Sequence, residues 1–203
     1  MEQLPIAKVD YEEARHLADL VSTAQDLGYV VEVCDCLLAM VSDGVEDSVL
    51  SQAYWSSALV AYVRCFATGV RAPLTEADVA TLEGDGLEAH RIFKSMRDKH
   101  IAHSVNPFEQ ILVGVMLPPT GSDEVGVQGV ATLSANLVTL SEEWITLLRN
   151  LARMLREMVV QRARNAEDAV LQVAKAESFI ALRKREPLRV YAPGERGDEA
   201  RPR

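Results

Sequence analysis

Hydrophobic residues recur every three or four positions over most of this chain, which is the spacing of an amphipathic α-helix. Residues 11–41 follow this pattern from Leu17 to Val41. Residues 47–68 repeat it with large apolar side chains and stop before a glycine. The pattern therefore predicts two long helices in the first third of the chain.

Three further helices are predicted from the same spacing. A short one is expected over residues 76–82, and another covers residues 87–104, because Pro107 disfavours helical geometry in the residue before it. A capping box at residues 139–142 precedes an apolar stripe that extends the last helix to about Arg185. The chain is thus expected to be mostly α.

The hydrophobic pattern changes to strict alternation after Pro107, which is typical of β-strands. Apolar residues alternate from Ile111 to Leu117, and a second alternating run extends from Val125 to Leu133. A polar loop with two prolines separates the runs. We therefore predict a β-hairpin over about residues 108–133, inserted in a helical bundle. Its glycines give a flat surface that could cover the helix over 87–104 or pair with another subunit.

Length and composition indicate one domain followed by a tail. A chain of 203 residues with 48% hydrophobic side chains is expected to build a single core, here over residues 1–186. Residues 187–203 are rich in proline, glycine and charged side chains, so they cannot bury enough apolar surface to fold alone. This tail is predicted to be disordered.

Charge and cysteine content narrow the functional classes. A net charge of −9 opposes non-specific coating of a phosphate backbone, and we expect no DNA ligand. The three cysteines do not suggest a disulfide framework, and neither a signal peptide nor an apolar stretch of membrane-spanning length is visible. The chain is expected to be cytoplasmic, without a membrane partner, and no metal or other cofactor is predicted.

Residues 87–108 hold three of the four histidines and are the place where the sequence suggests chemistry. On a straight helix, Arg97, His100 and His103 spread over about 120° at its end. Arginine offers a fork of donors to phosphate oxygens, and histidine can move a proton near neutral pH. These residue types suit phosphodiester chemistry. The alternative is that the charges are solvated and that the histidines cap or pack the helix.

The spacing of Arg97, Asp98 and His103 resembles the Arg-(four to six residues)-His motif of the HEPN superfamily. The string Arg-Asp-Lys-His-Ile-Ala-His-Ser is similar to a branch related to abortive-infection proteins. The resemblance implies a HEPN-like helical bundle that pairs across a two-fold axis. It also implies a metal-independent ribonuclease of a toxin, phage-defence or RNA-processing system, with a possible antitoxin partner.

The same resemblance assigns roles to the motif. His103 would be the general base on a ribose 2′-hydroxyl, Arg97 would stabilise charge on the scissile phosphate, and Asp98 would orient the site. The product would carry a 2′,3′-cyclic phosphate. His100 is an auxiliary candidate that could donate a proton to the leaving oxygen. Because a straight helix keeps Arg97 and His103 apart, either its last turn unwinds or a second subunit completes the site.

Further basic residues are candidates to hold RNA phosphates, and they lie on three of the expected helices. They are Arg64, Lys94, Lys99, Arg149 and Arg153. A charged stripe on a helix is more often a solvated face, so this assignment depends on where the helices pack.

Two other functional readings stay open. A helical nucleotide- or protein-binding module without catalysis explains the acidic net charge more easily than a nuclease does. A purely structural helical protein would have its motif histidines buried and hydrogen-bonded. The readings differ in whether the two Arg97 and His103 sets of a dimer face a shared basic cleft, as a nuclease requires, or are occluded.

Overall fold

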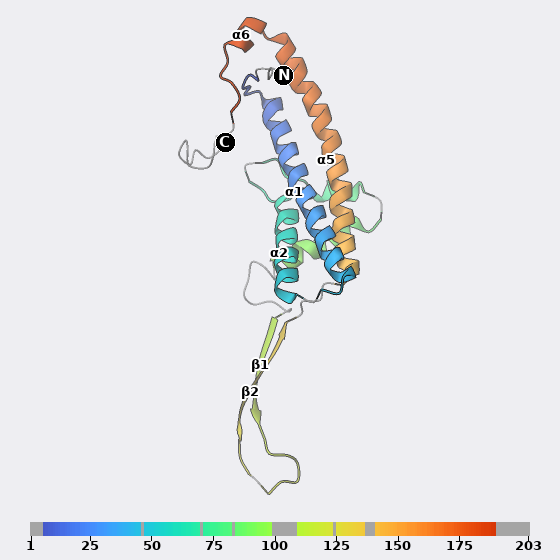
Figure 1. Cartoon of the computed structure of the whole chain (residues 1–203), viewed down its shortest axis with the longest axis vertical. Helices are drawn as coiled ribbons and strands as arrows, with labels where there is room; N and C mark the ends of the chain where they lie inside the picture. Colours follow the sequence, from blue (N-terminus) through green and yellow to red (C-terminus); the bar gives the residue numbers. More distant parts are fainter. Residues whose placement is uncertain are drawn as a thin grey trace.

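The computed structural model describes residues 6–45, 47–69, 71–82, 84–98, 109–123, 125–136 and 141–189. Within these ranges the chain is mostly helical, with an antiparallel two-stranded hairpin, as the hydrophobic pattern predicted (Figure 1). The elements are α1 (Glu12–Ser42), α2 (Ser48–Arg64), α3 (Glu76–Ala80), α4 (Gly86–Met96), β1 (Glu109–Met116), β2 (Gly129–Asn136), α5 (Glu142–Ala176) and α6 (Phe179–Arg183). None of the described helices is long and apolar enough to cross a membrane.

The two longest helices, α1 and α5, lie side by side in opposite directions and form the axis of the molecule (Figure 1). Their facing stripes are fully buried, with Leu27, Val30 and Leu37 on α1 and Leu148 and Leu155 on α5. Burial of each such side chain contributes about 1.5–3 kcal/mol. The helical body is therefore held mainly by this long apolar seam.

An aromatic cluster joins α2 and α4 to the start of α5. Phe93 of α4 contacts the rings of Trp55, Tyr62 and Trp144 edge-on, with centroids 5.9–6.1 Å apart. Edge-to-face pairs of this kind stabilise by about 0.5–1.5 kcal/mol beyond the area they bury. The end of α4 is thus fixed by three neighbours on two other helices.

Some helix ends differ from the sequence-based expectation. The last helix was expected to continue to about Arg185, but α5 ends at Ala176 and Glu177 is extended, with ψ at 152°. The Glu177 carboxylate accepts hydrogen bonds from Tyr11 and Arg185, so contacts between distant segments override the local helical pattern. Likewise α2 ends at Arg64 rather than residue 68, and the chain then turns back so that the N–H of Leu74 donates to the carbonyl of Cys65.

The hairpin extends away from the helices as an arm (Figure 1). Its register pairs Leu112 with Leu133 and Gly114 with Ala131. The second strand begins at Gly129, not at Val125 as predicted, because Gly126 has φ at +118° and interrupts the extended backbone. Alternation of apolar residues alone therefore placed the start of this strand too early.

The two ends of the described chain meet at the far end of the helical body from the hairpin (Figure 1). Ala7 and Pro187 form an antiparallel bridge, and the N–H of Leu188 donates to the carbonyl of Ile6 at 2.8 Å. Pro187 and Leu188, at the start of the expected disordered tail, are thus paired with the N-terminal segment. Residues 190–203 lie outside the described part of the chain.

Candidate functional site

Helix α4 presents an apolar side to the body and a basic side to solvent. Ala89, His90 and Phe93 are buried, whereas Arg91 and Lys94 are exposed. The helix was expected to continue to about residue 104, but regular α-helix ends at Met96. Arg97 and Asp98 continue as a wider π-helical turn. Such wider turns occur often at functional sites because they change the direction of the following side chains.

Arg97 and Asp98 contact each other at this turn. Arg97 Nη1 lies 3.1 Å from Asp98 Oδ1, and the two side chains are 31% and 46% exposed. A guanidinium has five N–H donors, so one carboxylate contact leaves donors that can reach a phosphate. The pair can therefore hold the guanidinium in place while an anion approaches from solvent.

The other motif residues fall outside the described ranges. His100, His103 and the basic candidate Lys99 all belong to residues 99–108, which are not among those the structure describes. The expected convergence of Arg97 and His103 therefore stays a prediction. The described part of the site is the Arg97–Asp98 turn and the α4 face that leads to it.

The third histidine of this segment, His90, has a structural place. It is 1% exposed, its Nδ1 lies 3.0 Å from the hydroxyl of Tyr62, and its ring is 4.3 Å from that of Phe66. Burial lowers its pKa from the ordinary value near 6.5. Its position three residues before Phe93, on the apolar side of α4, is the sequence signal for this role.

The basic candidates divide into paired and exposed residues. Arg64 pairs with Asp26 of α1, which also binds Arg71, and Arg149 pairs with Asp35 at 3.1 Å. Lys94 and Arg153 are exposed, and no ion pair of either is found among the described residues. Lys94 is one turn before Arg97 and on the same side of α4. Of these candidates, Lys94 is therefore the described residue placed to extend the Arg97 site.

Arg64 is held against α1 by Asp26. Its hydrogen bonds with that carboxylate raise its pKa. Asp26 therefore occupies donors of Arg64 that an RNA phosphate would otherwise need.

A groove of about 410 Å³ separates α4 from α5. Apolar side chains line it, including Ile92, Trp144 and Leu147, and its charged lining residues are the exposed carboxylates Asp85 and Glu88. Lys94 lies about 200° round the helix from Ile92. The groove is therefore unsuited to phosphate, which we expect to approach from the Lys94 side.

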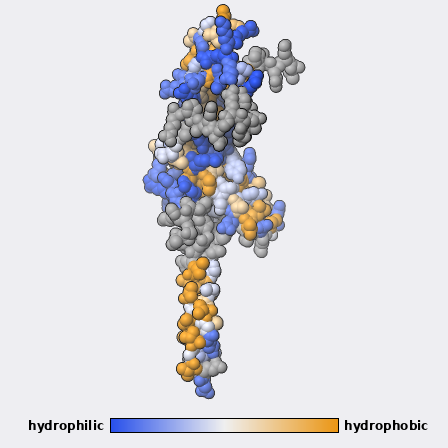
Figure 2. All heavy atoms as spheres, turned by 90° about the vertical axis from the view of Figure 1, so that its left-hand side faces the viewer, coloured by the Kyte–Doolittle hydropathy of each residue, from blue (hydrophilic) through white to orange (hydrophobic). Residues whose placement is uncertain are grey.

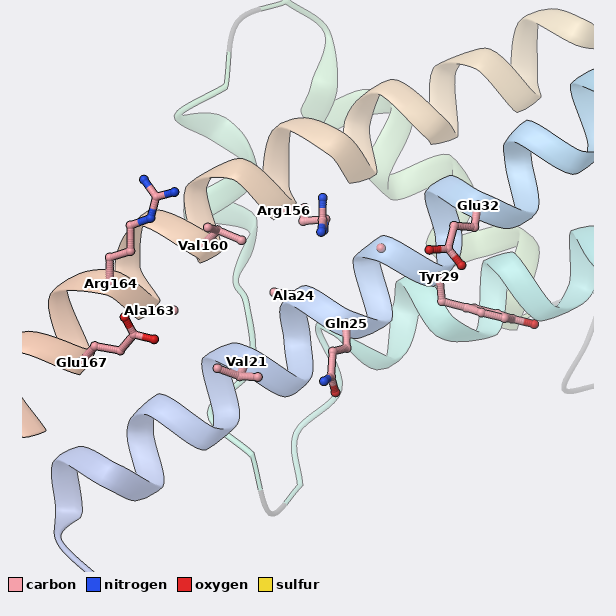
Figure 3. Close-up of a pocket in the computed structure, with 11 residues that line it drawn as sticks. Val21, Ala24, Gln25, Tyr29, Glu32, Arg156, Val160, Ala163, Arg164 and Glu167 are labelled. Carbon is pink, nitrogen blue, oxygen red and sulfur yellow. The ribbon is translucent and has the colours of Figure 1, made fainter. Parts of the chain in front are cut away.

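A second cavity, of about 500 Å³, lies between α1 and α5 (Figure 3). Arg156 and Arg164 of α5 and Glu32 of α1 line it together with apolar residues. A Cβ at Gly28 would be 3.3 Å from Arg156 Nε, so this glycine leaves room for the guanidinium. With Glu167 the lining holds two arginines and two glutamates, so its formal charges balance, and none of these residues belongs to α4.

No cluster of three or more histidine, cysteine, aspartate or glutamate side chains suited to a metal ion occurs in the described ranges. Comparison of the chain with protein-family models, curated proteins and solved structures gives no match. The resemblance to HEPN proteins therefore rests on the residues at and after the end of α4.

Proposed function

We propose that the protein is a metal-independent endoribonuclease of the kind found in toxin or phage-defence systems. The observation that carries this proposal is the Arg97–Asp98 pair, which is partly exposed in a wider turn at the end of α4 with Lys94 one turn before it. An anchored guanidinium beside an exposed lysine is suited to a single-stranded phosphodiester.

In this proposal the reaction is transesterification within the RNA. His103 removes the proton of a ribose 2′-hydroxyl, whose oxygen attacks the adjacent phosphorus. Arg97 stabilises the charge that develops on the phosphate oxygens, and Asp98 keeps the guanidinium oriented through their 3.1 Å contact. His100 gives a proton to the leaving 5′-oxygen. The products are a 2′,3′-cyclic phosphate and a free 5′-hydroxyl.

The proposed assembly is a homodimer in which two such turns face one cleft, and an antitoxin could act by covering that cleft. A shared cleft would also bring the exposed Lys94 side chains of two subunits near one RNA strand. This adds positive charge that an acidic monomer lacks, since the net charge is −9.

A second candidate function is a non-catalytic nucleotide- or protein-binding module. The acidic rim of the α4–α5 groove favours it, because Asp85 and Glu88 would attract a basic peptide and repel RNA. In that case the purified protein would cut no RNA. Arg97→Ala would weaken affinity for a nucleotide bound on the Lys94 side, and Glu88→Gln would weaken affinity for a basic peptide in the groove.

The test is cleavage of a fluorescent single-stranded RNA by wild type, Arg97→Ala and His103→Ala. Loss of a general base should lower the rate about 10²–10⁴-fold, and His100→Ala should be milder. Cleavage should persist in EDTA, and the products should carry the cyclic phosphate. Arg164→Ala and His16→Ala are matched controls, because both residues are exposed on helices other than α4.

Equal cleavage by wild type and His103→Ala, after contaminating nucleases are excluded, would overturn the catalytic assignment. Loss of cleavage in EDTA would overturn the metal-independent mechanism. The helical circular dichroism signal of each variant should match wild type, which separates loss of chemistry from loss of fold.

A further inference from the structure

The hairpin exposes more apolar surface than a water-solvated arm needs. Ile111, Val113 and Val115 are 60–74% exposed, and Leu112 and Leu133 are 59% and 69% exposed. Figure 2 shows hydrophobic residues along much of the visible face of the arm, with hydrophilic residues toward its tip. Contiguous exposed apolar surface of this kind marks an interaction site.

The two faces of the hairpin differ in shape. One face, here called the leucine face, consists of Leu112, Gly114, Met116, Gly129, Ala131 and Leu133. Its paired leucines form a ridge, and the neighbouring pair of Gly114 and Ala131 forms a hollow, since no heavy atom lies within 4 Å of a Cβ built on Gly114. The opposite face is covered by β-branched side chains and carries the hydroxyls of Thr132 and Ser134 on β2.

The arm also lacks the features that usually prevent exposed strands from associating with another chain. Residues 110–116 and 129–136 contain no charged side chain and no proline, which are the usual protection of exposed strands. A two-stranded hairpin is marginally stable in water by itself and gains stability when a face is covered. Its stability is therefore coupled to whatever packs on it.

We propose that the leucine face packs against the same face of a second copy of this chain. In this dimer the two-fold axis lies between the two facing leucine faces, perpendicular to the strands and level with Val113 and Thr132. It places Leu112 of each copy over Gly114 of the other. The same operation sets Leu133 over Ala131. The leucine ridge of each copy therefore fits into the hollow of the other, and the contact is isologous. If the axis ran along the strands instead, Leu112 would meet Leu133 and the hollows would face each other.

This pairing is separate from the proposed nuclease dimer. The paired arms run in opposite directions, so the two helical bodies lie at opposite ends of a contact about 27 Å long. The ends of α4 therefore cannot meet through it. A face two strands wide is smaller than a standard interface, which buries about 800 Å² on each partner, so we expect micromolar affinity.

The test is sedimentation equilibrium of the full chain from about 1 to about 100 μM. Wild type should self-associate, and Gly114→Ile should weaken association roughly tenfold or more by filling the hollow. This variant distinguishes shape complementarity from non-specific hydrophobic association, because isoleucine favours a strand and adds apolar area. Non-specific association would become stronger. Val113→Lys, at a similarly exposed position on the opposite face, is the control and should associate like wild type.

A charge exchange tests the register. Leu133→Lys and Ala131→Asp should each weaken association, and the double variant should restore it, because each lysine then lies over an aspartate of the other copy. Pairing through the helices would be unaffected by all of these substitutions. Stronger association of Gly114→Ile, loss of association in Val113→Lys, or no rescue would overturn the proposal. A monomeric wild type that floats with phosphatidylcholine vesicles would also overturn it and indicate a membrane ligand.

Discussion

The burial of His90 makes the free energy of unfolding depend on pH. Its Nδ1 lies within hydrogen-bond distance of the Tyr62 hydroxyl, and a neutral ring nitrogen can accept that bond, whereas a protonated one cannot. Among the described residues no hydrogen bond joins a carboxylate to the ring, and the charge of Glu76 raises the pKa of His90 by less than burial lowers it. Burial therefore lowers the pKa of His90 in the folded state, and the folded protein holds the neutral ring.

We predict that the free energy of unfolding falls as the pH drops below about 6.5. In that range the unfolded chain binds a proton at His90 and the folded chain does not, so acid favours unfolding by at most about 1.4 kcal/mol per pH unit. Urea unfolding of wild type between about pH 7.5 and about pH 5.5 measures this slope, above the range where ion-paired carboxylates titrate.

His90→Gln should remove most of that slope, because the amide can still bond Tyr62 but does not titrate. His16→Ala, which changes an exposed histidine on α1, should keep it. Identical slopes for wild type and His90→Gln would show that another group causes the pH dependence.

The arginines show that the partner of a single side chain could not be predicted from the hydrophobic pattern. The pattern placed Arg64 and Arg149 on helices correctly, but their partners Asp26 and Asp35 lie on α1, far away in the sequence. Whether an arginine binds RNA or a carboxylate depends on packing, which hydrophobic spacing does not specify. The Arg97–Asp98 contact was accessible to sequence reasoning because its partners are neighbours.

Helices and strands were predicted well where the pattern was long. The 31 residues of α1 agree with the expected range of 11–41 to within one residue at each end. The predicted ends are wrong where one residue or one distant contact determines the boundary. Examples are Gly126 before β2 and Glu177 after α5. Hydrophobic spacing cannot predict these two boundaries. The start of β2 depends on the positive φ of Gly126, and the end of α5 depends on the contact of Glu177 with Tyr11.

The hairpin should be removable without loss of the helical body. Its large apolar residues are 47–74% exposed, so the strands contribute little to the core. We predict that replacing residues 110–135 by a short Gly-Ser linker leaves the melting temperature nearly unchanged, since a shorter loop also costs less closure entropy. Thermal melts followed by circular dichroism at 222 nm measure this. A loss of many degrees would show that the arm supports the helices.

The whole molecule is a helical body with an apolar arm at one end and joined chain termini at the other (Figure 1). This division was only partly accessible from sequence. Composition predicted a tail from residue 187, but it could not show that Pro187 and Leu188 pair with Ala7 and Ile6, because backbone hydrogen bonds leave no mark on composition. The contact of Tyr11 with Glu177 closes the same end.

The last prediction concerns that closed end. Removing residues 190–203 should leave the melting temperature unchanged, because their composition offers little apolar surface to bury. Removing residues 187–203 also deletes the donor to Ile6, and it loosens the bond from Lys8 to the carbonyl of Glu186. A loss of about 1 kcal/mol lowers the melting temperature of a chain this size by about 2–4 °C. Calorimetry of the two truncations decides the matter: equal melting temperatures would show that the Ala7–Pro187 bridge adds no stability, and a large loss in the shorter truncation would show that residues 190–203 dock on the body.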